Sequence, residues 1–214
     1  MQKKLLDFAA ELGLQLTPKS AELLIQYADL VWQKKDTLNL TSVSDKDEII
    51  TRHICDGLAG AGWIARLPKQ EDLKIADVGT GAGYIGITIA ITLPHVKMTL
   101  VESLQRRCMF LNWAILKLGL QNVQVENIRL GQHATGPFDV ITERAMGQLD
   151  EVLPWVTPSL KETGVFVAYQ SARGVVTENL LARLSLREEQ PVSYVLPHEE
   201  RERYLRIFKK HGHC

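Results

Sequence analysis

The chain has 214 residues, of which 45% are hydrophobic and 23% are charged, a composition that excludes disordered, collagen-like and coiled-coil proteins. Its 25 Lys and Arg residues equal its 25 Asp and Glu residues, so the formal net charge is zero. This balance excludes binding of nucleic acid through overall charge, although it is compatible with a local basic patch.

Residues 1–66 are predicted to form a helical extension. Apolar residues recur at helical spacing in three segments, 5–12, 23–31 and 44–54, the third of which is expected to start at Ser44. Thr17 followed by Pro18 is a typical start for the second helix. The link at 37–43 is unusually apolar for a loop, so we expect it to be docked against the rest of the protein.

From residue 73 onward, strand-like runs alternate with helical segments, which is typical of a parallel sheet covered on both faces. Strands are predicted at 73–78, 98–102, 123–127, 138–142 and 165–169. Helices are predicted at 84–93, at 104–118 with Ser103 as N-cap, and at 149–160. The last two strands, 191–196 and 203–209, are too close in sequence for a crossover helix and should pair antiparallel. We therefore predict an α/β fold with a seven-stranded sheet, in a core of residues 67–214.

Three cysteines are widely spaced along the chain, at Cys55, Cys108 and Cys214. They indicate neither a disulfide framework nor a zinc site, which suits a reducing cytosol. The start of the chain carries charges where a signal peptide would be apolar, and no segment approaches the ~20 apolar residues of a membrane span. We therefore expect a cytoplasmic protein, monomeric, without a membrane segment or a bound metal.

The densest glycine cluster follows the first predicted strand directly and runs into a helix. Ligands of open α/β sheets bind at the carboxyl ends of strands, so this turn is the expected floor of a nucleotide site. The expected cofactor-binding residues here are Asp77, Gly79, Gly81 and Gly83. Glycines at such a turn let a ligand touch the backbone, and the alternative is a tight turn without a ligand.

The segment Gly81-Ala-Gly83-Tyr-Ile-Gly86 also fits the dinucleotide fingerprint G-x-G-x-x-G. In dinucleotide sites the first glycine of the fingerprint stands at the end of the strand. Here the first glycine of the fingerprint, Gly81, comes later, because the strand ends soon after Asp77 and Gly79 follows directly. An acid followed by G-x-G-x-G is similar to the loop of S-adenosylmethionine-dependent methyltransferases. Glu102 ends the second predicted strand about twenty residues later, where a carboxylate can accept both ribose hydroxyls.

Beyond this loop, the whole chain resembles the ribosomal RNA small-subunit methyltransferase G family, also called glucose-inhibited division protein B. The matching motifs are Leu38-Asn-Leu-Thr41, Arg52-His53 with Asp56, Asp77 to Gly83, Glu102-Ser103, Arg144-Ala145 and Glu200 to Ile207. The resemblance implies a class I S-adenosylmethionine-dependent methyltransferase fold, which is Rossmann-like. It also implies methylation of guanine N7 in 16S ribosomal RNA, as RNA or in the assembled small subunit.

Cofactor contacts implied by the resemblance are Gly79, Tyr84, Glu102, Leu130, Gly131 and Arg144. Arg144 is also expected near the target base, and it is the predicted catalytic residue. Guanine N7 holds a lone pair and no proton, so the reaction needs alignment rather than a catalytic base. Tyr84 and Tyr169 are candidates for stacking on the base, and His53 is either a core residue, a partner of Asp56 or a substrate contact.

Some positions depart from the family pattern, among them Gly131, Glu143 and the 169–171 segment. A lysine is missing from that segment, and together with the gain of Glu143 this lowers the positive charge expected near RNA. Two alternatives therefore stay open. One is a class I methyltransferase with a different substrate, and the other is a catalytically inactive module that binds the cofactor or RNA.

Overall fold

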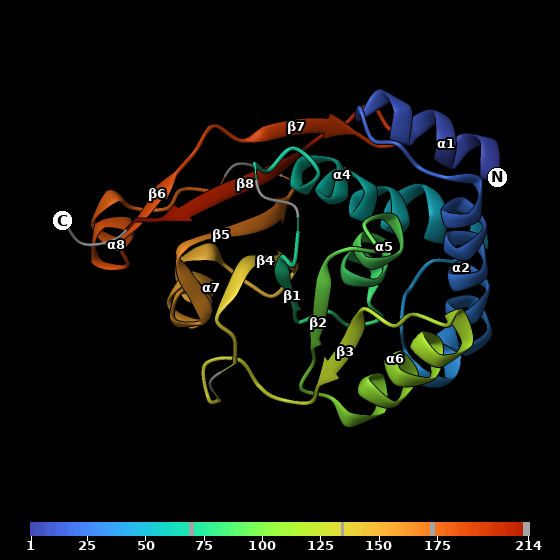
Figure 1. Ribbon diagram of the computed structural model, residues 1–214, viewed down its shortest axis with the longest axis horizontal. Coiled ribbons are helices and arrows are strands. Elements are labelled where there is room, and N and C mark those ends of the chain that lie inside the picture. Colours follow the sequence, from blue (N-terminus) through green and yellow to red (C-terminus); the bar gives the residue numbers. More distant parts are fainter. Residues whose placement is uncertain (69–70, 134, 172–173, 212–214) are drawn as a thin grey trace.

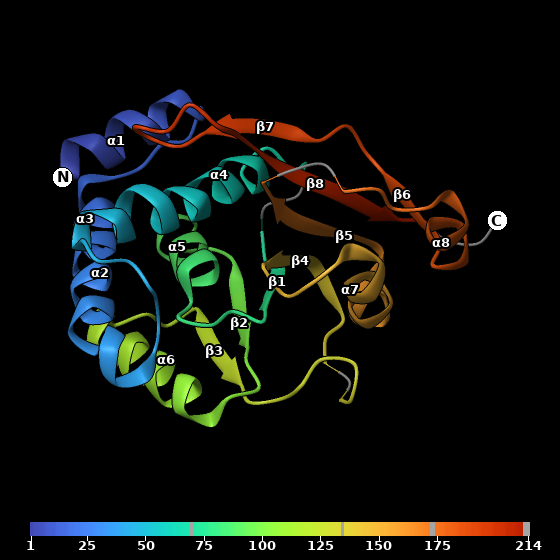
Figure 2. The same cartoon turned by 180° about the vertical axis from the view of Figure 1, so that it is seen from behind.

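The computed structural model describes residues 1–68, 71–133, 135–171 and 174–211, so Cys214 lies outside the described part. One mixed sheet crosses the molecule and carries helices on both faces (Figures 1 and 2). The helices are α1 (Gln2–Glu11), α2 (Pro18–Leu38), α3 (Lys46–Glu48), the π-helix η1 (Ile49–Ile54), α4 (Cys55–Ile64), α5 (Tyr84–Thr92), α6 (Gln105–Leu118), α7 (Leu149–Val156), the 3₁₀ turn η2 (Thr157–Ser159) and α8 (Glu178–Arg183).

The strands are β1 (Lys74–Val78), β2 (Lys97–Val101), β3 (Val123–Glu126), β4 (Phe138–Arg144), β5 (Leu160–Gln170), β6 (Leu186–Glu188), β7 (Val192–Val195) and β8 (Glu202–Lys210). Their order is β3-β2-β1-β4-β5-β8-β6, and β7 also pairs with β8. Strands β1 to β5 are parallel, and β8 runs antiparallel to β5, β6 and β7. The predicted parallel sheet with an antiparallel tail is thereby confirmed.

The structure has an eighth strand, β6, where the sequence predicts seven. Strand β8 is flanked on one edge by two short pieces, with β7 beside Leu205 and β6 beside Lys210. Strand β6 has only three residues and follows the short helix α8, so its alternation is too brief to be recognised in the sequence.

Three predicted helix boundaries were wrong. Asp45, not Ser44, caps the third helical segment by accepting the N–H of Asp47, and the middle of that segment is a π-helix. Helix α6 has no Ser103 cap, since the Glu102 carboxylate accepts the Leu104 N–H instead. Helix α7 ends at Val156 because the chain turns through η2 into β5. Strand β5 begins earlier than predicted. Polar residues in its first half interrupt the apolar pattern by which the strand was recognised in the sequence.

The helices of the first 66 residues share one hydrophobic cluster with a face of the sheet. Leu24 of α2 and Ile54 of η1 belong to the same buried cluster as Ile87 of α5. The Tyr27 hydroxyl donates to the Ala82 carbonyl at 2.7 Å, so α2 touches the glycine loop directly. Leu40 is buried as well, which confirms that the 37–43 link is docked. A second hydrophobic cluster lies on the face of the sheet that α7 and α8 cover. The boundary between a helical extension and a core at residues 66 and 67 stays a prediction.

Helix α4 passes very close to its neighbours at two glycines. A Cβ atom added at Gly60 would lie 1.8 Å from the Tyr169 hydroxyl oxygen, and one at Gly57 would lie 2.5 Å from Thr88 Cβ. At Gly62, by contrast, the nearest atom is Leu12 Cβ at 3.4 Å. The close approach of α4 to α5 and β5 therefore depends on the first two glycines and not on the third.

We predict that Gly60→Ala lowers the free energy of unfolding by about 1–3 kcal/mol, because the packed interior must shift to accept the methyl group. The matched variant Gly62→Ala should be neutral or stabilising by up to about 1 kcal/mol, because alanine is the better helix former. Urea denaturation of the two variants beside the wild type measures both effects. Equal losses of stability would contradict the packing described here.

Candidate functional site

Three adjoining cavities lie along the carboxyl-terminal edge of the sheet. The Glu102 cavity, of about 650 Å³, includes Gly79, Glu102, Leu130, Gly131 and Trp155 in its lining. The loop cavity, of about 220 Å³, includes Leu40, Gly79, Gly81, Tyr84 and Arg144. The Asp56 cavity, of about 440 Å³, includes Arg52, His53, Asp56, Arg144 and Arg203. Ala145 lines all three, and Arg144 lines the last two, so this pair stands where the cavities meet.

The glycine loop after β1 presents bare backbone to the first two cavities. Gly79 and Gly81 both have a left-handed backbone, with φ of 60° and 61°. A Cβ at Gly81 would enter open space, with the Gly79 carbonyl oxygen 3.9 Å away as the nearest atom. At Gly79, in contrast, a Cβ would collide with the Met146 side chain.

Gly83 at the end of the loop and Gly86 in α5 serve packing. A Cβ at Gly83 would be 2.7 Å from Leu111, and one at Gly86 would be 2.3 Å from Leu100. Gly83 is absent from the linings of the three cavities given above, so its predicted cofactor contact stays a prediction.

Asp77 fixes the glycine loop through hydrogen bonds to its carboxylate. Its buried carboxylate accepts hydrogen bonds from the Thr80 hydroxyl, from the Gly86 N–H at 3.0 Å and from the Thr142 hydroxyl at 3.0 Å. Burial raises the pKa of this carboxyl group, and the three hydrogen bonds oppose that shift. Because the donors come from the loop, α5 and β4, Asp77 fixes the loop relative to two neighbouring elements.

Glu102 joins the end of β2 to the same loop. Its Oε1 accepts the Leu104 N–H at 2.8 Å, and its Oε2 accepts the Gly81 N–H at 3.0 Å. Arg107 Nη1 lies 3.6 Å from Oε2, so Arg107 is an ion-pair partner of Glu102. A carboxylate has about four acceptor positions, so Glu102 still has room for a further donor.

Leu130 and Gly131 line the Glu102 cavity together with Trp155 of α7. Gly131 has a φ of 85°, and a Cβ there would be 3.0 Å from the Trp155 ring. Trp155 is 42% exposed, which is unusual for so large an apolar side chain. Sequence reasoning missed Trp155 and Met146. The only signal for Trp155 was a bulky aromatic residue outside the buried stripe of its helix.

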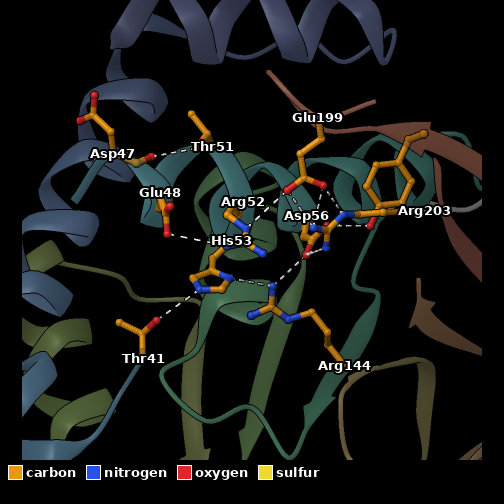
Figure 3. Close-up of polar contacts among 11 residues, drawn as sticks. Thr41, Asp47, Glu48, Thr51, Arg52, His53, Asp56, Arg144, Glu199 and Arg203 are labelled. Carbon is orange, nitrogen blue, oxygen red and sulfur yellow. Dashed lines mark hydrogen bonds and ion pairs between the residues drawn. The ribbon is translucent and has the colours of Figure 1, made fainter. Parts of the chain in front are cut away.

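Arg144, at the end of β4, is held by two residues of the η1–α4 segment (Figure 3). Its Nη1 donates to Asp56 Oδ2 at 2.8 Å and contacts His53 Nδ1 at 3.2 Å. Because a guanidinium group only donates, Nδ1 must accept, and the ring proton of His53 is therefore on Nε2, which lies 3.3 Å from the Thr41 hydroxyl. Burial and the nearby arginines lower the pKa of His53 to about 3, so the ring is neutral.

Asp56 connects this segment to the carboxyl-terminal strands. It is 1% exposed and accepts the Tyr194 hydroxyl at 2.8 Å and Arg203 Nη1 at 3.3 Å. Arg203 in turn forms an ion pair with Glu199 (Figure 3). The His53 ring also stacks on Tyr84, with centroids 4.3 Å apart. The structure thus brings together four of the residues singled out in the sequence, namely His53, Asp56, Tyr84 and Arg144.

Within residues 1–68, 71–133, 135–171 and 174–211, no three His, Cys, Asp or Glu side chains gather as a metal site. None of the helices in these ranges has the length and apolar character needed to cross a membrane. Cys55 and Cys108 are both buried free thiols.

The chain matches the family model described as rRNA small subunit methyltransferase G over residues 20–203. Proteins named ribosomal RNA small subunit methyltransferase G match almost the whole chain. The one from Carboxydothermus hydrogenoformans is 32% identical, over 98% of this chain and 92% of the relative. The one from Bacillus cytotoxicus is 31% identical, over 94% of this chain and 86% of the relative.

Solved structures resemble the fold at low sequence identity. Magnesium protoporphyrin IX methyltransferase from Synechocystis PCC 6803 with bound SAM has a TM-score of 0.63 at 10% identity, covering 86% of this chain and 97% of that chain. Ribosomal protein L11 methylase from Lactobacillus delbrueckii subsp. bulgaricus has a TM-score of 0.55 at 19% identity, covering 75% and 79%. These likenesses confirm the predicted methyltransferase fold and concern the fold alone.

Glu143, beside Arg144 on β4, is fully buried, so its charge does not face the surface as the sequence suggested. Its Oε1 accepts the Met146 N–H, and its Oε2 has no hydrogen-bond partner in the described part of the chain. Burial raises the pKa of this carboxyl group from 4.5 to about 7.

This raised pKa gives a pH-dependent prediction. Ionisation of Glu143 is opposed in the folded protein only, so the contribution of Glu143 to wild-type stability falls as pH rises from about 4.5 to about 7. Glu143→Gln removes the titration and keeps an acceptor for Met146. The variant should match the wild type near pH 4.5 and exceed it at pH 8 by on the order of 3 kcal/mol.

Urea denaturation across this pH range checks the prediction, with Glu200→Gln at an exposed position as the control. If the difference in free energy of unfolding between Glu143→Gln and wild type did not change with pH, folding would not oppose the ionisation of Glu143, which would contradict the prediction.

Proposed function

The chain belongs to the rRNA small subunit methyltransferase G family, and on this basis we propose that it methylates N7 of a guanine in 16S ribosomal RNA with S-adenosylmethionine as donor. The observation that carries the proposal is the row of three cavities with Arg144 and Ala145 at their junction. One end of this row suits a nucleoside and the other end has a basic lining. The proposed enzyme acts as a monomer in the cytoplasm, on ribosomal RNA or the assembled small subunit.

The residues of the first two cavities fit the cofactor. Glu102 has acceptor capacity for ribose hydroxyls at the wall of the Glu102 cavity, and Leu130, Gly131 and Trp155 offer an apolar surface for adenine. The bare backbone at Gly81 leaves open space in which the methionine portion fits. Asp77 belongs to the lining of the loop cavity and holds the loop that carries this contact surface.

When bound, S-adenosylmethionine supplies a methyl group on a sulfonium sulfur. The N7 lone pair of guanine attacks the methyl carbon while the bond between this carbon and the sulfur breaks. N7 carries no proton to remove, so the chain needs no general base. His53 is neutral, but its Nδ1 is occupied by Arg144 and serves orientation. The task of the protein is alignment, an effect that contributes on the order of 7 kcal/mol or more.

The Asp56 cavity has the local basic character that the overall composition lacks. Its lining contains three arginines, Arg52, Arg144 and Arg203, and one acid, Asp56, while Glu48 and Glu199 pair with these arginines from outside the lining. Arg52 is about half exposed at the rim, where it can reach a phosphate. This patch supports an RNA substrate in a chain with zero net charge. The family match over residues 20–203 favours neither of the two alternatives.

Methyl transfer is tested by incubating the protein with radiolabelled S-adenosylmethionine and, separately, naked 16S RNA, isolated small subunits or total protein. We expect label at N7 of one guanine in 16S RNA, located by cleavage at the modified base. Label in protein, or at another RNA position, would contradict the proposal, as would cofactor binding without transfer to any of the three.

We predict that Gly81→Asn lowers the affinity for S-adenosylhomocysteine by about tenfold or more, because its side chain enters the space assigned to the cofactor. Asparagine tolerates a left-handed backbone better than most residues, which limits the strain. Gly119→Asn is the matched control, since Gly119 has a φ of 66° at the end of α6 and open space around it.

Calorimetric titration of both variants measures the affinity, and thermal unfolding measures the shared backbone strain. Equal affinities of the Gly81 and Gly119 variants would mean that the cofactor lies elsewhere.

A further inference from the structure

Of the three cavities, the Asp56 cavity is the one that the proposed function does not assign to the cofactor, and we propose that it receives the target guanine, which Arg144 selects by donating a hydrogen bond to guanine O6. His53 and Asp56 are the positioning residues that orient Arg144 for this contact. The inference rests on the proposed function and deepens it, because it names the acceptor site and the atom that is recognised.

The first argument is the distribution of donors on Arg144. A guanidinium group has five N–H donors. His53 Nδ1 and Asp56 Oδ2 occupy the two donors of Nη1, at 3.2 Å and 2.8 Å. The Nε and Nη2 atoms have no hydrogen-bond partner in the part of the chain that the structure describes. One side of the guanidinium group is therefore fixed by the protein, and the other side has donors to offer a ligand.

The second argument is that Arg144 is held in place before any ligand arrives. Asp56 is buried and is itself anchored by Tyr194 and Arg203, which come from the antiparallel strands β7 and β8. On the other side, the Arg144 guanidinium carbon lies 5.4 Å from the centroid of the Tyr84 ring. A donor that is fixed in advance loses little entropy when it binds a base.

The third argument comes from the atoms of the purines. Guanine places two acceptors side by side, N7 and O6, whereas adenine places an amino donor beside N7. Since N7 must stay free to attack the methyl group, O6 is the neighbouring atom that a donor can use. An adenine in the same pose would turn its amino group toward Arg144, donor against donor. Arg144 thus favours guanine at the junction where the loop cavity meets the Asp56 cavity.

A matched pair of variants separates the acceptor of His53 from its ring. His53→Asn keeps an acceptor near the position of Nδ1 and loses the ring that stacks on Tyr84. His53→Phe keeps a ring and loses the acceptor. Each variant is measured for kcat and KM with 16S RNA or small subunits, for S-adenosylhomocysteine affinity by calorimetry, and for thermal unfolding.

We expect His53→Phe to lower kcat/KM for RNA by about tenfold or more with S-adenosylhomocysteine affinity within about twofold of wild type, and His53→Asn to retain most activity. Equal losses in the two variants would overturn the role of the Nδ1 acceptor. A loss of cofactor affinity as large as the loss of kcat/KM would overturn the assignment of Arg144 to the base.

The wild-type protein gives an independent test through substrate analogues at the labelled position. Inosine keeps O6 and N7 and lacks only the 2-amino group, so it should be methylated at a rate near that of guanine. 2-Aminopurine keeps N7 and lacks O6, so its rate should fall by about tenfold or more. Equal rates for the two analogues would overturn recognition through O6. Absence of transfer to natural RNA would instead contradict the proposed function itself.

Discussion

The functional edge of this protein depends on two buried carboxylates, each of which fixes a segment that faces a cavity. Asp77 accepts hydrogen bonds from Thr80, Gly86 and Thr142, and this holds the glycine loop between α5 and β4. Asp56 plays the corresponding part for Arg144 and links η1–α4 to the last strands. Buried carboxylates need such hydrogen-bonded partners, and here the partners are the backbone and side chains that line the site. The site is therefore preorganised by hydrogen bonds of two buried carboxylates that belong to its own lining.

Much of this arrangement could be predicted because it is local in sequence. The acid-ended strand, the glycines and Glu102 lie within about thirty residues, and a strand–turn–helix unit brings them together by its geometry alone. The alternation of strands and helices likewise predicted the sheet, because periodicity and spacing are written directly in the chain. The motif containing Arg52, His53 and Asp56 carried the family resemblance, although the sequence could not tell what His53 touches.

The rest could not be predicted because it depends on contacts between distant segments. Asp56 meets Tyr194 and Arg203, and these pairs are separated by 138 and 147 positions. Glu143 is buried and accepts the Met146 N–H, and neither fact is apparent from a charged residue at a strand end. The different roles of the glycines could not be predicted for the same reason. Only the neighbouring residues in the folded protein show which glycines allow close packing and which border open space.

The most direct test of the account is a crystal structure of the protein with S-adenosylhomocysteine. The account predicts the ribose hydroxyls at Glu102, the adenine against Leu130 and Trp155, and the sulfur at the junction beside Ala145, with the Asp56–Arg144 ion pair retained. A ligand whose sugar lies away from Glu102, or one that fills the Asp56 cavity and displaces Arg144 from Asp56, would contradict it.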